Sequence, residues 1–172
     1  LDVAASSFYK ITQGSPVYEV DGKELTKEEL NNLYADLVSE FDLFSIEDPF
    51  EQEDFESFEK LRESNKKIFV VGDDLTVSNK VLLNKAIGKG SINAMIIKPN
   101  QIGTLSETLE TMQLARENDI GLIVSHRGEE TDDDFIADLA YAFGCFGLKA
   151  GAPTKSERML KYKRLIKITN NQ

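Results

Sequence analysis

The chain of 172 residues is nearly without cysteine and has no long apolar run. It contains one cysteine and no tryptophan. Because Cys145 has no second cysteine to pair with, an intrachain disulfide is excluded, and a reducing, cytoplasmic location is the simplest expectation. No apolar run approaches the roughly 18 to 20 residues that a membrane-spanning helix requires. We therefore expect neither covalent cross-links nor insertion into a membrane.

Basic residues are also scarce. The chain has 20 Lys and Arg against 30 Asp and Glu, which gives a formal net charge of −10. Nucleic acids and anionic membrane surfaces are bound through clustered positive charge, so both classes of partner are disfavoured. An acidic chain can still bind a small anionic substrate where the local site is basic or holds a metal ion.

What the sequence does contain is a repeated pattern, in which a short apolar run stops at charged residues. The runs are too short for helices and rich in β-formers, so they predict strands buried on both faces. The charged ends recur every 23 to 28 residues, which is the length of one strand and one helix. They lie at Glu47, Asp73, Lys98, His126 and Lys149, and a further strand with an acid at its start is predicted over Leu1–Ala5.

Helix starts fit this periodicity. Thr26 with Glu29 and Thr104 with Glu107 have the spacing of a capping box, and Ser78 is expected to cap a third helix. Residues 10–25 are read as irregular, with Val17–Val20 as a possible small surface strand.

Six strand–helix units in succession predict a parallel sheet of the α/β class. A doubly wound sheet usually has a Gly-rich phosphate loop, and neither G-x-G-x-x-G nor a Walker A sequence occurs here. Polar residues after every strand are instead typical of a TIM-type barrel. We interpret residues 1–172 as a single domain, a barrel segment of six units, and expect the first two of eight strands to precede Leu1.

The acids at the predicted strand ends form a candidate metal site. Asp2, Glu47 and Asp73 could converge on one Mg²⁺, which prefers a few carboxylates and keeps room for substrate oxygens. The alternative is that they are solvated loop acids or helix caps. Three acids at matched strand ends favour the metal.

The cationic residues suggest the accompanying chemistry. Lys98 follows an apolar strand, so partial desolvation would suit it as a general base, although a structural ion pair is an equal alternative. His126 is the only histidine, and a lone histidine is often structural. Arg127 beside it and Lys149 one strand on favour a pocket for an anion. Together these groups suit proton abstraction next to a substrate carboxylate.

These motifs resemble enolase (phosphopyruvate hydratase), in its carboxyl-terminal barrel portion, and the likeness runs through almost the whole chain. A lysine or histidine base with Mg²⁺ is a known pattern of the enolase superfamily, so the resemblance and the chemistry above are not independent. The matching stretches are residues 1–6, 45–50, 72–77, 98–104, 124–127, 135–139, 151–153 and 156–158.

The resemblance implies a role for each residue of the set. Asp2, Glu47 and Asp73 would hold the catalytic Mg²⁺, and Lys98 would remove the C2 proton of 2-phosphoglycerate on the way to phosphoenolpyruvate. The remaining three would bind substrate: Lys149 its carboxylate, Arg127 its phosphate, and His126 the region of the departing hydroxyl.

Some positions depart from the family pattern. After His126-Arg127 the usual Ser-Gly-Glu-Thr is replaced by Gly128-Glu129-Glu130-Thr131. Gly128 removes a hydroxyl expected near the phosphate, and Glu129 adds a negative charge. The usual Thr and Arg at two later positions are Ala150 and Lys155.

The family also has upstream parts, an amino-terminal α+β domain and the first barrel strands, which would supply the general acid. We therefore expect the isolated segment to be inactive, and we expect it to associate with itself, with that missing half or with a partner chain. Two alternatives remain open. One is a divergent enolase-like lyase acting on another carboxylate substrate, and the other is a non-catalytic enolase-like scaffold.

Overall fold

The computed structural model describes residues 1–170, which form two compact units. Unit 1 comprises Leu1–Thr76 and Val81–Ala94, and the described part of unit 2 comprises Val77–Lys80 and residues 95–170. Each unit is described by itself. None of the helices in residues 1–170 combines the length and the apolar character needed to cross a membrane.

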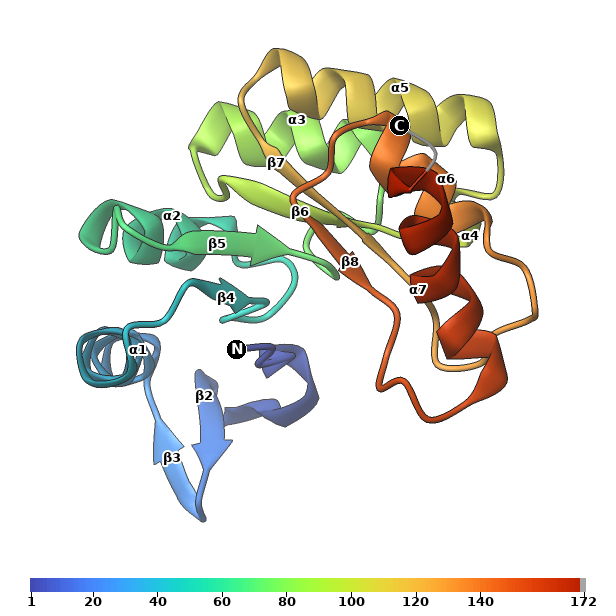
Figure 1. Cartoon of the computed structure of the whole chain (residues 1–172). Coiled ribbons are helices and arrows are strands. Elements are labelled where there is room, and N and C mark those ends of the chain that lie inside the picture. The colour runs from blue at the N-terminus through green and yellow to red at the C-terminus, as the bar shows by residue number, and fades with distance from the viewer. Residues whose placement is uncertain (171–172) are drawn as a thin grey trace. The chain divides into compact units, whose positions relative to one another are not determined.

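Unit 1 has a short 3-10 helix and a small β sheet, followed by alternating helices and strands (Figure 1). Its elements are η1 (Ala5–Phe8), β1 (Tyr9–Thr12), β2 (Ser15–Val20), β3 (Lys23–Leu25), α1 (Lys27–Phe41), β4 (Ser45–Glu47), α2 (Phe55–Ser64), β5 (Phe69–Gly72) and most of α3 (Lys80–Lys89).

The region expected to be irregular, residues 10–25, is a three-stranded antiparallel sheet in the order β1–β2–β3. Its hairpin loops are the two-residue turns Gln13-Gly14 and Asp21-Gly22, in which all four residues have positive φ. Such turns match the twist of paired strands, and Asp-Gly is a frequent sequence for them. The irregular reading was therefore wrong, and the possible strand at Val17–Val20 is part of β2.

The parallel pairing of unit 1 lies at β4 and β5, where Glu47 is opposite Val71. The strand expected over Leu1–Ala5 is present only as a single parallel bridge between Asp2 and Glu47. Ala4 adopts a left-handed conformation with φ of 46°, which ends the extended backbone and starts η1. Short as it is, the bridge places Asp2 beside the end of β4.

Helix α1 starts as expected. The Thr26 hydroxyl accepts the N–H of Glu29, and the Glu29 carboxylate accepts the N–H of Thr26 in return. This reciprocal capping box satisfies two backbone donors at the helix start.

An aromatic cluster centred on Phe50 fills the interior of unit 1. The Phe50 ring makes edge contacts with Tyr18, Tyr34 and Phe58, and its side chain is 1% exposed. The Tyr34 hydroxyl also donates to the carbonyl of Pro49 at 2.7 Å. The packing of the Phe50 ring therefore anchors the segment that follows Glu47.

Unit 2 continues the alternation of strand and helix (Figure 1). Its elements are β6 (Ala94–Ile97), α4 (Pro99–Ile102), α5 (Leu105–Glu117), β7 (Gly121–Ser125), α6 (Phe135–Ala142), β8 (Gly147–Lys149) and α7 (Ser156–Thr169). All four residues of β6 are buried, as the apolar run predicted. Five of the six expected strands are therefore formed.

Strands β6, β7 and β8 are neighbours in that order, and β7 pairs with β8 in parallel, with Ser125 opposite Lys149. Helices α6 and α7 pack side by side (Figure 1). The Arg164 guanidinium joins them by hydrogen bonds to both carboxylate oxygens of Asp138, at 2.6 to 3.1 Å. This pairing fixes α7 beside α6, in the same unit as the ends of β7 and β8.

The aromatic cluster leads to a stability prediction. Phe50→Ala should lower the free energy of unfolding by about 3–5 kcal/mol, because it removes a buried ring and leaves a cavity. Phe41→Ala is the matched control, since the Phe41 ring is 60% exposed, and it should change stability by at most about 0.5 kcal/mol. Urea denaturation of both variants tests this, and equal losses would contradict it.

Candidate active site

The predicted metal ligands all lie in unit 1, at the end of β4 and β5. Glu47 is the last residue of β4, and Asp73 directly follows β5. Both are buried, with exposures of 6% and 8%, whereas Asp2 is exposed. The N–H of Val3 donates to the carbonyl of Glu47 at 2.9 Å, so backbone pairing brings the amino-terminal acid to the same edge. The structure thus gathers the three predicted acids at one edge of this unit.

A fourth acid, Asp48, organises this edge and was not among the predicted site residues. Its carboxylate accepts the backbone N–H of Asp73 at 2.9 Å and that of Asp74 at 2.8 Å, one on each oxygen. Its own N–H donates to the carbonyl of Val71. Asp48 therefore fixes the turn after β5, and with it the backbone that carries Asp73.

Burial raises the pKa of Asp48 to about 7, and the two backbone N–H bonds oppose that rise. Carboxylate oxygens of Asp48, Asp73 and Asp74 lie within 4.8 Å of one another, close enough to surround a cation. Asp2 and Glu47 are not part of that group of three. Because both Asp48 oxygens already accept backbone donors, we assign Asp48 to holding the turn, and the oxygen-rich edge as a whole fits a hard divalent ion.

The predicted cationic residues all lie in unit 2, at the ends of β6, β7 and β8. Lys98 directly follows β6 and is half-buried. Its backbone N–H donates to the hydroxyl of Ser78 at 2.8 Å, and that hydroxyl donates to Gln101 at 3.0 Å. Ser78 was expected to cap a helix, but α3 begins at Lys80 and the Ser78 hydroxyl binds the backbone N–H of Lys98 and the side chain of Gln101. Its real contribution is to fix the backbone of the candidate base.

His126 and Lys149 are adjacent at the next strand ends. The N–H of His126 donates to the carbonyl of Lys149 at 2.8 Å, which extends the pairing of β7 with β8 by one residue. The Arg127 guanidinium is exposed and donates to the side-chain oxygen of Asn100, just after Lys98, at 3.2 Å. The structure therefore brings the four predicted cationic positions to the carboxyl ends of three neighbouring strands.

The loop after β7 is held by helix α7, through residues that the sequence analysis did not assign to the site. Arg158 donates to the carbonyls of Arg127 and Gly128 at 2.9 and 2.7 Å. Lys161, 1% exposed, pairs with Glu130 at 2.8 Å and donates to the carbonyl of Thr131. No local pattern marks these residues, because their partners lie about 30 positions earlier in the chain. The three-residue spacing of Arg158 and Lys161 could have indicated that they share one face of a helix, but not which loop that face contacts.

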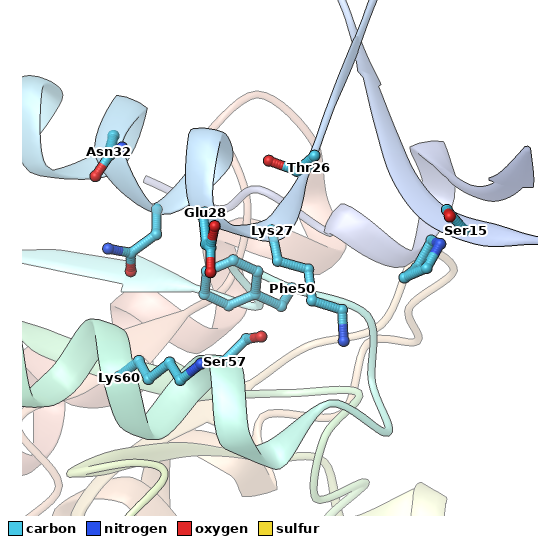
Figure 2. A pocket seen from close by; sticks show the side chains of 10 residues that line it. Ser15, Thr26, Lys27, Glu28, Asn32, Phe50, Ser57 and Lys60 are labelled. Carbon is cyan, nitrogen blue, oxygen red and sulfur yellow. The ribbon is translucent and has the colours of Figure 1, made fainter.

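A cavity of about 430 Å³ lies elsewhere in unit 1. Figure 2 shows Lys27 and Glu28 of α1 and Ser57 and Lys60 of α2 around the Phe50 ring. None of the predicted site residues lines it. The predicted site residues therefore lie at the strand ends and not at this cavity.

Alternating strands and helices, with acids and bases at the carboxyl ends of the strands, define an α/β enzyme domain of the barrel class. The chain belongs to the enolase family: the family model described as "Enolase, C-terminal TIM barrel domain" matches residues 1–172. Proteins named Enolase from Methanopyrus kandleri and Sulfurisphaera tokodaii are 48% and 47% identical over 98% and 99% of this chain. Enolase 1 of Lactobacillus gasseri is 50% identical over 97%. The chain spans about two fifths of the length of these curated relatives, 39% to 40%.

The Asp48 bonds can be tested by stability. Asp48→Ala leaves two backbone N–H groups at the β5 turn without their acceptors, which should cost about 2–4 kcal/mol. Asp48→Asn keeps one acceptor oxygen but turns an NH₂ group toward the other donor, so its loss should be smaller and still measurable. Thermal or urea unfolding of both variants checks the order. A change below about 0.5 kcal/mol in Asp48→Ala would show that the bonds do not hold the turn.

Proposed function

We propose that this chain is the carboxyl-terminal catalytic part of an enolase, a phosphopyruvate hydratase that reversibly dehydrates 2-phosphoglycerate to phosphoenolpyruvate in cytoplasmic glycolysis. The observation that carries the proposal is the family match over the whole chain, at close to half identity to proteins named Enolase. Membership also supports treating residues 1–172 as one domain. The acids and cations at the strand ends are consistent with it.

Asp2, Glu47 and Asp73 would hold the Mg²⁺ ion. The donor set fits, because hard oxygen ligands suit Mg²⁺ and two of the carboxylates are buried at paired strand ends. When bound, the ion would supply positive charge to a substrate that gains negative charge during the reaction. Asp48 would keep the Asp73 backbone in register.

The cations of unit 2 would act on the substrate itself. Lys98 would take the proton from C2, while Lys149 binds the carboxylate and Arg127 the phosphate. His126 would contact the region of the hydroxyl at C3, which leaves with a proton as water. The acid that delivers that proton is not among the residues assigned here, and we propose that an upstream part or a partner chain supplies it.

A substitution of Lys98 tests the reaction. In the complete protein that contains this chain, Lys98→Ala should lower kcat for 2-phosphoglycerate by about 10² to 10⁴-fold, since it removes a general base. Lys163→Ala is the control, because Lys163 is an exposed lysine on α7. Removal of divalent ions should abolish turnover in the unmodified protein, and added Mg²⁺ should restore it. Turnover of Lys98→Ala within threefold of the parent, or activity only on other hydroxy acids, would favour the alternatives.

The two alternatives predict different results in the same assays. A divergent lyase would turn over a member of an acid-sugar panel better than 2-phosphoglycerate, a possibility that Gly128 and Glu129 motivate. A scaffold would keep its biological role in Lys98→Ala. Both are tested without new variants.

A separate prediction concerns the 172-residue chain alone. Without an upstream acid it should bind Mg²⁺ yet show no efficient dehydration of 2-phosphoglycerate, and we expect it to self-associate. Calorimetric titration with Mg²⁺, a turnover assay and light scattering would check these three properties. Full turnover by a pure monomer of this length would refute the need for a further part.

A further inference from the structure

We infer that Arg158 holds His126 as a neutral imidazole with its proton on Nε2, so that the ring offers a hydrogen-bond donor and not a base at its outer nitrogen. Arg158 is thus a positioning residue. The assignment of the tautomer rests on the geometry alone. What the donor is used for rests on the proposed function.

The first step is that the Arg158 guanidinium cannot move freely. The side chain is 9% exposed, and two of its nitrogens donate to the backbone carbonyls of Arg127 and Gly128 at 2.9 and 2.7 Å. These carbonyls belong to the two residues that directly follow His126. The guanidinium is therefore fixed to the same loop that carries the ring.

The second step is the contact between Nη1 of Arg158 and Nδ1 of His126. A guanidinium has only N–H donors and no acceptor, and it stays protonated in proteins. The contact is a hydrogen bond only if Nδ1 is the acceptor. An Nδ1–H tautomer would set two donors against each other, and an imidazolium would also set two cations against each other. One form remains, with nitrogen Nε2 protonated and Nδ1 not.

The third step is that both side chains lie close to Gly151, in the loop after β8. Gly151 has φ of +76°, and a Cβ there would lie 3.2 Å from Cε1 of His126 and 3.3 Å from Cδ of Arg158. The Gly151 carbonyl in turn accepts the Tyr162 hydroxyl at 2.5 Å. Arg158, Lys161 and Tyr162 have the spacing of one helical face, so α7 presses all three onto the loops after β7 and β8.

The consequence for the site follows from which ring nitrogen of His126 can donate a hydrogen bond to a ligand. With Nδ1 occupied, Nε2–H is the only polar atom of the ring left for a ligand. His126 would then donate a hydrogen bond to an oxygen of the substrate near C3 and would not accept a proton there. This deepens the proposed function by assigning the direction of that hydrogen bond.

The tautomer can be read directly by long-range ¹H–¹⁵N NMR of the imidazole nitrogens in the complete protein. The His126 signals are assigned by their absence in His126→Gln. We expect a pyrrole-type Nε2 and a pyridine-type Nδ1 at neutral pH. A protonated Nδ1 or an imidazolium in the unmodified protein would overturn the inference, and the assignment control is the one variant that this measurement requires.

Arg158→Met should convert the pattern to a mixture of both tautomers. Lys161→Met is the matched control, because Lys161 holds the same loop through Glu130 and Thr131 without touching the ring, and the tautomer should persist. Equal shifts in both variants would show that the loop, and not Arg158, sets the proton. Arg158→Lys, which keeps the charge but not the fork of donors, serves if Arg158→Met does not fold.

Kinetics supply the second readout. If His126 donates to the reacting substrate, Arg158→Met should lower kcat about 10²-fold through misplacement of the ring, with KM changed much less. An unchanged kcat despite a mixed tautomer would overturn the assigned use of Nε2–H and leave the tautomer standing. Absence of turnover in the unmodified protein would instead reject the proposed function, and the two failures are therefore distinguishable.

Discussion

A charged group that leaves water must be surrounded by donors or by opposite charge, and this requirement shapes the strand ends of each unit. In unit 1, the buried Asp48 carboxylate is satisfied by the N–H groups of Asp73 and Asp74. The donors are backbone N–H groups, so no second charged side chain is needed. They fix the turn that carries Asp73, so the bonds that satisfy the buried Asp48 carboxylate also position a neighbouring acid.

In unit 2, the same requirement is met by partners that lie much farther apart along the chain. Arg158 and Lys161 are buried cations that use backbone carbonyls, together with Glu130, as their partners. The carbonyls belong to the loop that carries His126 and Arg127. Arg164 and Asp138 join α7 to α6. The loop is therefore held by a helix that is itself fixed to its neighbour. The exposed Arg127 guanidinium can then reach outward from a fixed backbone.

What the sequence could predict follows from how local each interaction is. The capping box of Thr26 and the buried strand before Lys98 depend on residues within a few positions, and both are formed as predicted. Ala4 has a left-handed backbone conformation, which reduces the first strand to a single bridge. An alanine in the sequence does not indicate that conformation, so it could not be predicted. The pairing of β1 with β2 was missed because Gln13-Gly14 is a less familiar hairpin turn than Asp21-Gly22. The Arg158 contacts needed the fold, since nothing near position 158 announces a partner at 126.

The departures from the family pattern at Gly128 and Glu129 can be weighed against this geometry. Arg158 binds the carbonyl of residue 128, which every amino acid has, and a Cβ at that position would meet no atom within 4 Å. The Glu129 side chain is exposed. Glu130, whose carboxylate accepts the Arg127 N–H and pairs with Lys161, keeps the residue usual in the family. The substitutions thus fall where side chains face outward and spare the side chain that holds the loop. Any effect on function would therefore come through the charge and hydrogen bonding offered to a ligand, and not through loss of the loop's support.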